Sequence, residues 1–150
     1  LKKISRPSAL SGPWEDLTPA PIIGATLWMD RLVMTERFIG LLGTATHWVF
    51  NKSRIMGLPG PEQVLSVVIS GAHQYVKTDP AAIQEMAMAD LSRCLPGFSD
   101  ARLLHGRVIK EPFATLSPIP GSEAKRPEPG SGIAGFLFSG DWTRTGFPAS

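Results

Sequence analysis

The stretch "VLSVVISGAHQYVKTDPAAIQEMAMADLSRC", residues 64–94, places an apolar segment directly before the clearest helical pattern of this 150-residue chain. Residues 64–73 are rich in β-branched side chains, which predicts a buried strand. Asp79 is a typical N-cap residue and Pro80 suits the first helical position, so a helix is expected to begin there. Its apolar face at helical spacing comprises Ile83, Met86, Ala87, Leu91 and Cys94. Pro96-Gly97 ends the helical pattern.

Strand-like segments flank this unit on both sides. Residues 21–30, "PIIGATLWMD", predict a strand. The segments "FIGLLG" and "THWVFN" predict one or two more, with a bend at Gly43-Thr44, and residues 53–63 predict a loop. Residues 101–118 predict an extended strand, and "IAGFLFSG", residues 133–140, a last buried one. Short links favour an antiparallel meander, so we expect an α+β fold with a mostly antiparallel sheet and one main helix.

Composition narrows the class of protein. Hydrophobic residues make up 43% and charged residues 19%, as in globular proteins. The net charge of +2 is not gathered in basic patches, so we expect no nucleic-acid partner. Cys94 is the single cysteine, which excludes an internal disulfide and fits a reducing compartment. No apolar run of about 18 residues occurs, so no transmembrane helix is expected, and we expect a cytoplasmic protein.

A glycine motif near the end of the chain resembles a dinucleotide fingerprint in spacing alone. Gly130-x-Gly132-x-x-Gly135 follows a loop and precedes a predicted strand. A phosphate-binding fingerprint instead follows a strand and opens a helix, whose N-terminus faces the pyrophosphate. We therefore interpret this motif as a flexible loop.

The following segment, "FLFSGDWTRTGFPAS" (residues 136–150), has the features of a ligand site at a strand end. Asp141 follows the apolar stretch, and its carboxylate can accept hydrogen bonds from the hydroxyls of a sugar or ribityl chain. Gly140 permits close approach of a ligand to the backbone, and Pro148 suits the first turn of a helix. The alternative, that Asp141 only caps a turn, is equally compatible with these residues.

The same segment resembles the C-terminal flavin-binding motif of the flavin amine oxidase and phytoene desaturase superfamily. The "GDWT", "TG" and "PAS" elements look most like the squalene-associated FAD-dependent desaturases, now understood as hydroxysqualene dehydroxylases. Residues 21–33 ("PIIGATLWMDRLV"), 38–53 ("FIGLLGTATHWVFNKS") and 125–127 ("KRP") are similar to segments of these proteins in the same order. The superfamily's N-terminal strand-GxGxxG-helix unit is absent, so we expect a C-terminal fragment that lacks the N-terminal part of its own chain.

The resemblance implies a cofactor, FAD, and the residues that contact it. Gly140 and Asp141 match the pair that lies against the pyrophosphate and ribityl part of FAD, and Trp142 and Thr143 match positions that line the flavin. The loop toward the flavin-facing helix is matched by Thr145, Gly146, Phe147 and Pro148. Arg126 matches a basic position before the last strand.

The resemblance also implies a division into a connecting segment (1–20), part of a substrate-binding domain (21–120), and a C-terminal piece of a Rossmann-like FAD-binding domain (121–150), which would contribute its last strand. We expect redox chemistry on a long polyprenyl lipid, most specifically conversion of hydroxysqualene to squalene for hopanoid synthesis. Peripheral contact with the inner face of the membrane is expected, and the fragment alone is expected to be inactive. The alternatives are a carotenoid desaturase, a flavin amine oxidase and a non-enzymatic binding domain.

Three residues are weak candidates for lining the substrate: His47, Trp48 and Phe50. Core packing explains aromatic residues in strands equally well. The histidines show no metal-ligand spacing, so no metal site is expected. The sequence identifies no catalytic side chain beyond the flavin.

Overall fold

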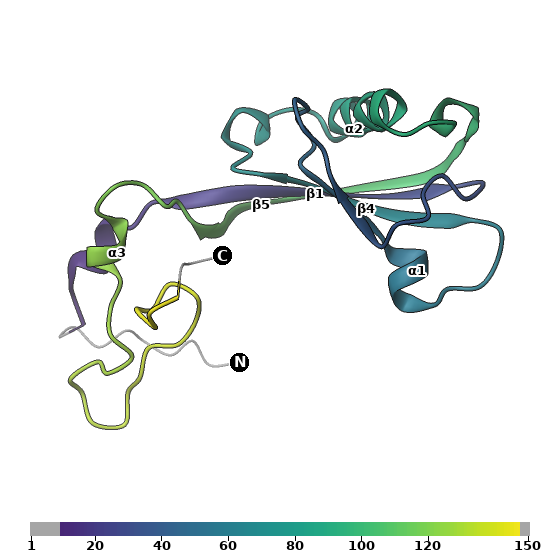
Figure 1. The fold of residues 1–150 in the computed structure, drawn as a ribbon. Coiled ribbons are helices and arrows are strands. Elements are labelled where there is room, and N and C mark those ends of the chain that lie inside the picture. The colour runs from purple at the N-terminus through teal and green to yellow at the C-terminus, as the bar shows by residue number, and fades with distance from the viewer. Residues whose placement is uncertain (1–9, 148–150) are drawn as a thin grey trace. The chain divides into compact units, whose positions relative to one another are not determined.

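The computed structural model describes residues 10–147, which contain one five-stranded sheet with strand order β2-β3-β4-β1-β5. The strands are β1 (Pro19–Met29), β2 (Phe38–Gly40), β3 (Trp48–Asn51), β4 (Gln63–Ser70) and β5 (Leu103–Leu116). The helices are α1 (Lys52–Met56), α2 (Pro80–Cys94) and α3 (Ser122–Lys125). Short 3-10 turns cover Pro13–Asp16, His73–Tyr75 and Phe98–Asp100. The α+β fold with a mostly antiparallel sheet is confirmed (Figure 1).

The chain divides into two compact units. One holds residues 21–112, and the other holds the described parts of 1–20 and 113–150. The boundaries fall within β1 and β5. Each unit is described by itself below.

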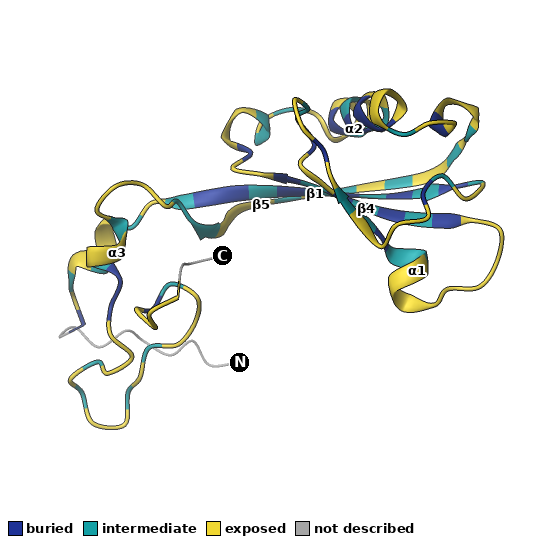
Figure 2. Ribbon diagram, viewed as in Figure 1, coloured by how far each residue is buried: buried dark blue, intermediate teal, exposed yellow. Residues whose placement is uncertain are grey.

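The pairing of β1 with β4 organises the larger unit. The two strands are antiparallel, and the register sets Ile23 opposite Ile69, Ala25 opposite Val67 and Leu27 opposite Leu65. All six side chains are buried. Because side chains alternate between the faces of a strand, one face of the pair is apolar throughout. Figure 2 shows this alternation of buried and partly exposed residues along the strands.

Helix α2 covers the buried face of the sheet (Figure 1). It begins as predicted, with the Asp79 side chain accepting a hydrogen bond from the Ala81 amide and Pro80 in the first turn. Its buried apolar residues are Ile83, Ala87 and Leu91. The predicted apolar face is wrong at its last position, because Cys94 is exposed in the final turn.

Two features of the larger unit differ from the sequence prediction. The segment predicted as a loop begins with helix α1, which the Asn51 side chain caps by accepting from the Arg54 amide at 3.0 Å, and which Gly57 ends at φ 64°. The sheet is not a simple meander, since β1 pairs with β4 and not with β2. The long, alternating β1 and β4 offer more paired surface to each other than the three-residue β2 can offer.

The smaller unit lacks the predicted strand over residues 133–140. The described chain there makes one isolated bridge, between Gly130 and Leu137, and otherwise turns. The Ser131 hydroxyl accepts from the Ile133 amide, and the Phe136 amide donates to the Ile133 carbonyl. These local bonds occupy backbone groups that a regular strand would need for pairing.

Hydrogen bonds of Asp30 connect the end of β1 to the segment before β5. Its carboxylate accepts from the Arg102 amide at 2.9 Å and from the Arg31 guanidinium at 3.1 Å. These donors hold the pKa of the Asp30 carboxyl below its ordinary value, the Arg31 bond contributing most. The backbone amide of Asp30 in turn donates to the Arg102 carbonyl.

The packing of α2 on the sheet leads to a stability prediction. Ala87 is fully buried between helix and sheet, whereas Ala89 is exposed on the same helix. Replacing Ala87 with Leu should lower the free energy of unfolding by about 1–3 kcal/mol through overpacking. The matched variant Ala89→Leu should change it by less than about 0.5 kcal/mol. Urea titration followed by circular dichroism measures both, and equal effects would show that this interface is loosely packed.

Candidate functional site

The sheet face opposite α2 carries a group of aromatic side chains, which we call the aromatic face: Phe38, Trp48, Phe50 and Trp28. The register places Phe38 opposite Phe50 on β2 and β3. The Trp48 and Phe50 rings are stacked with centroids 6.3 Å apart, and Phe38 lies 6.2 Å from each. Phe38 and Trp48 remain 57% and 44% exposed, so no described part of the chain covers them.

Small residues occupy the middle of this face. The ladder places Trp48 and Gly24 on either side of Val68, and Phe50 and Thr26 on either side of Ser66. Between the rings and the far side of β1, this face therefore carries Gly24, Thr26 and Ser66 together with the larger Val68. A Cβ added at Gly24 would meet no non-neighbouring atom nearer than the Val67 carbonyl oxygen at 4.0 Å. Packing within the described chain therefore does not require glycine at this position.

The weak candidates for substrate lining separate in the structure. Trp48 and Phe50 both lie on the aromatic face. His47 precedes them on the alternate side, where its Nδ1 accepts a hydrogen bond from the Ser70 amide at 3.1 Å. This bond places the proton of a neutral His47 on Nε2. His105, which the sequence did not single out, stacks on Trp28 with ring centroids 4.9 Å apart and borders the aromatic face.

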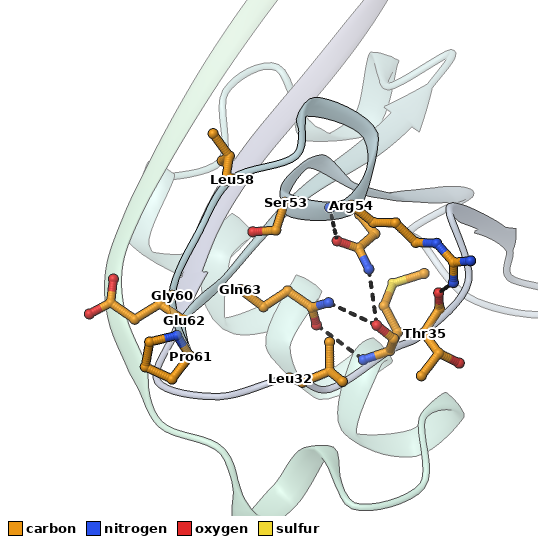
Figure 3. Close-up of a pocket in the computed structure, with 11 residues that line it drawn as sticks. Leu32, Thr35, Ser53, Arg54, Leu58, Gly60, Pro61, Glu62 and Gln63 are labelled. Carbon is orange, nitrogen blue, oxygen red and sulfur yellow. Dashed lines mark hydrogen bonds between the residues drawn. The ribbon is translucent and has the colours of Figure 1, made fainter.

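A pocket of about 370 Å³ lies beside α1, with polar side chains at its base (Figure 3). At its base, the buried Gln63 side chain accepts from the amides of Val33 and Met34 and donates to the Met34 carbonyl. Asn51, also buried, donates to the same carbonyl at 3.0 Å. Because the two amide side chains are fully engaged with the chain itself, we interpret them as fixing the segment that crosses from β1 to β2.

The predicted flavin-contacting residues lie on a tight loop of the smaller unit, which we call the 140–147 loop. The Thr143 amide and hydroxyl both donate to the Gly140 carbonyl, at 3.1 and 2.7 Å. The Trp142 indole donates to the Ser139 carbonyl at 2.9 Å. Gly140 has φ 125°, a conformation that favours glycine, and a Cβ there would lie 2.8 Å from the Trp142 ring. The loop conformation thus requires Gly140.

The described loop residues suit the polyol part of a flavin nucleotide. The Asp141 side chain is exposed and accepts from the Thr115 hydroxyl at 3.5 Å, and a carboxylate has acceptor capacity for further hydroxyl donors. Thr145, Gly146 and Phe147 are also exposed, and Gly146 has φ 83°. Pro148 lies outside the described residues. The residues present therefore fit FAD in donor and acceptor chemistry.

An aromatic pocket of about 630 Å³ lies next to this loop within the same unit. Phe138 is its centre, with its ring 5.1 Å from Trp14 and 5.3 Å from Trp142. Leu137, 76% exposed, and Phe136 complete the apolar lining. The sequence pattern predicted Trp142 here, whereas Trp14, distant in sequence, carried no signal.

Two further features of residues 10–147 bear on function. Histidine, cysteine and carboxylate side chains form no group of three able to hold a metal ion in this range. No helix among these residues has the length and apolar character needed to span a bilayer.

Comparisons with known proteins place the chain among flavin-dependent oxidoreductases. The family described as flavin containing amine oxidoreductase matches residues 12–150. The 15-cis-phytoene desaturase of Solanum lycopersicum is 27% identical over 91% of this chain and 25% of its own length. The hydroxysqualene dehydroxylase of Sinorhizobium fredii is 26% identical over 86% of this chain and 28% of its own length. The chain therefore spans about a quarter of the length of the curated relatives it matches.

A solved oxidoreductase from Methanosarcina mazei has the same fold over 86% of this chain and 30% of its own, with a TM-score of 0.61 at 16% identity. The comparisons confirm the superfamily resemblance and, through the family description, the expected flavin cofactor. They match desaturases and a dehydroxylase at nearly equal identity, so they support the superfamily and not one branch of it.

The Gln63 network yields a test of its structural role. Gln63→Leu should leave the amides of Val33 and Met34 without a buried partner, at a cost of about 1–3 kcal/mol for each group left unpaired, while the Met34 carbonyl keeps its bond from Asn51. The exposed Gln74→Leu is the matched control. Denaturant titration measures the difference, and if Gln63→Leu behaves like the control, water replaces the lost bonds.

Proposed function

The chain belongs to the flavin containing amine oxidoreductase family, and from this we propose that it forms the C-terminal part of an FAD-dependent oxidoreductase acting on a long polyprenyl hydrocarbon. The specific reaction we propose is conversion of hydroxysqualene to squalene. The exposed aromatic face carries the choice of substrate: we propose that its smaller side chains, Gly24, Thr26 and Ser66, form a shallow trough beside the rings that suits an extended apolar chain. Relatives of this chain include a hydroxysqualene dehydroxylase.

In this proposal the two units have separate tasks. The 140–147 loop binds the cofactor, with the Asp141 carboxylate accepting from ribityl hydroxyls and Gly140 permitting close backbone approach. Trp28, Trp48 and Phe50 hold the hydrocarbon by apolar contact and exclude water from it. When bound, reduced FAD would supply the hydride that replaces the substrate C–O bond with a C–H bond, the hydroxyl leaving with a proton as water, and a two-electron donor such as a reduced nicotinamide would be the source of the electrons.

The second candidate is a carotenoid desaturase of the phytoene type, which the phytoene desaturase relatives favour. The trough would hold a polyene as well as squalene, since both are long and apolar. An amine oxidase is less well supported. An aromatic cage would need tyrosines beside the flavin, whereas the single Tyr75 packs against the buried cluster around Ile23 and Ile83.

We also propose that the protein is cytoplasmic. Because polyprenyl substrates dissolve in lipid, we propose further that it makes peripheral contact with the inner face of the membrane. The loop around α1 offers a surface for this contact, with Met56 and Leu32 63% and 62% exposed.

Flavin binding is tested on the full-length protein. It should purify yellow, with an absorption band near about 450 nm set by the cofactor. Asp141→Ala should raise the dissociation constant for FAD about tenfold, because it removes a charged acceptor. Asp16→Ala, which removes a largely exposed carboxylate of the same unit, should leave it unchanged. Full flavin retention in Asp141→Ala would contradict the role of Asp141.

The proposed role of the trough is tested by replacing Gly24 with a larger residue. Gly24→Val should raise KM for the polyprenyl substrate by about tenfold, since the added methyls occupy space that the substrate needs. Flavin content should stay at the wild-type value, and the melting temperature should be at or above it, because an added Cβ meets no atom nearer than 4.0 Å and valine favours a strand more than glycine does. Thr26→Ser, which enlarges the trough, is the control and should leave KM near wild type. A wild-type KM in Gly24→Val would show that the substrate binds elsewhere.

A further inference from the structure

Arg126 is a charged side chain buried within the smaller unit. Its side chain is 2% exposed, and it directly follows helix α3. Burial of a guanidinium is unfavourable unless hydrogen-bond acceptors surround it. The acceptors that the Arg126 guanidinium contacts indicate what its burial contributes to the structure.

Among the described residues, three of its four acceptors are backbone carbonyls of the 140–147 loop. Nη1 donates to the Phe147 carbonyl at 2.8 Å, and Nη2 donates to the carbonyls of Asp141, at 2.9 Å, and Thr143. The fourth acceptor is the Glu123 carboxylate at 2.6 Å. That carboxylate is 62% exposed, so an ion pair with it does not explain why the guanidinium is buried.

The loop depends on this cation for its shape. Carbonyl oxygens that converge from three residues repel one another unless a donor lies between them. The C=O and N–H of one peptide unit point in opposite directions. Turning the Asp141 carbonyl toward Arg126 therefore turns the Trp142 amide toward the other side of the loop. The conformation of the 140–147 loop therefore depends on Arg126, which lies outside the loop.

Neighbouring bonds reinforce the same pair of segments. The Arg144 amide donates to the Pro127 carbonyl at 2.8 Å, and the Arg144 side chain donates to the Ala124 carbonyl at 3.0 Å. Residues 123–128 and 141–147 are thus joined at several points, with Arg126 at the buried centre. A lysine could not replace it, because a single ammonium lacks the planar fork that reaches carbonyls on two sides.

We propose that Arg126 is a positioning residue that holds the 140–147 loop in its cofactor-binding conformation through the Asp141, Thr143 and Phe147 carbonyls. This inference rests on the proposed flavin function for the meaning of the loop, but not for the loop geometry. Arg126 itself need not touch the cofactor. Its removal should therefore loosen the loop even in protein that holds no flavin.

The test uses full-length protein and four variants, of which Arg126→Ala removes the guanidinium altogether. Arg126→Lys keeps the charge and loses the fork, Glu123→Gln removes only the ion pair, and Arg107→Lys changes an exposed arginine of the larger unit as the control. Hydrogen–deuterium exchange of flavin-free protein and the FAD dissociation constant are measured for each.

Arg126→Lys should increase exchange locally in residues 140–147 and raise the FAD dissociation constant about tenfold or more. Glu123→Gln and Arg107→Lys should remain within about twofold of wild type, since each leaves the carbonyl bonds in place. Arg126→Ala should regain part of its FAD affinity when millimolar guanidinium is added, because the ion can occupy the vacated space. Protection of the loop should return with it.

Two results would overturn the proposal. One is wild-type exchange and FAD affinity in Arg126→Lys, and the other is increased exchange spread evenly over the whole chain, which would indicate a general structural role. If wild-type protein binds no FAD, the proposed function fails, while the exchange data still decide whether Arg126 orders the loop.

Discussion

The pairing of β1 with β4 is the constraint on which the larger unit depends. With this register, Ala25 and Leu27 must face α2, and Gly24 and Thr26 must face the other way. A shift by one residue would turn Gly24, Thr26 and Ser66 toward α2 and expose the buried apolar set, at a large cost in buried area. The same contact that builds the core therefore also creates the open aromatic face. Core and trough are two consequences of one register.

The smaller unit is held together by a different kind of interaction. Its described buried residues include the polar Arg126 and Thr143, both hydrogen-bonded to the 140–147 loop or within it. In this unit, backbone carbonyls accept hydrogen bonds from side chains rather than from the strands of a regular sheet. Polar bonding of this type specifies one geometry more sharply than apolar contact, because each bond has a narrow range of distance and angle.

The sequence predicted the elements whose signals are local. Asp79 and Pro80 predicted the start of α2, and apolar segments rich in β-branched residues predicted β1 and β4. Partner choice was not predictable, because the pairing of β1 with β4 over a long separation depends on competition among all strands. Residues 133–140 had the composition of a strand, but side-chain bonds from Ser131 turn the chain. The loop residues were identified by resemblance, whereas the role of Arg126 emerged only from its contacts.

Gly24 connects the energetics of the sheet to its proposed use. Glycine inside a strand costs about 0.5–1 kcal/mol relative to alanine, because the unfolded chain is more flexible and a packing side chain is missing. At Gly140 an added Cβ would clash with the Trp142 ring, so the loop requires glycine despite this cost. At Gly24 the nearest atom to an added Cβ is 4.0 Å away. The fold alone thus gives no reason for glycine here. A requirement for open surface at the centre of the aromatic face does, and it supports a role for this face in binding an extended apolar ligand.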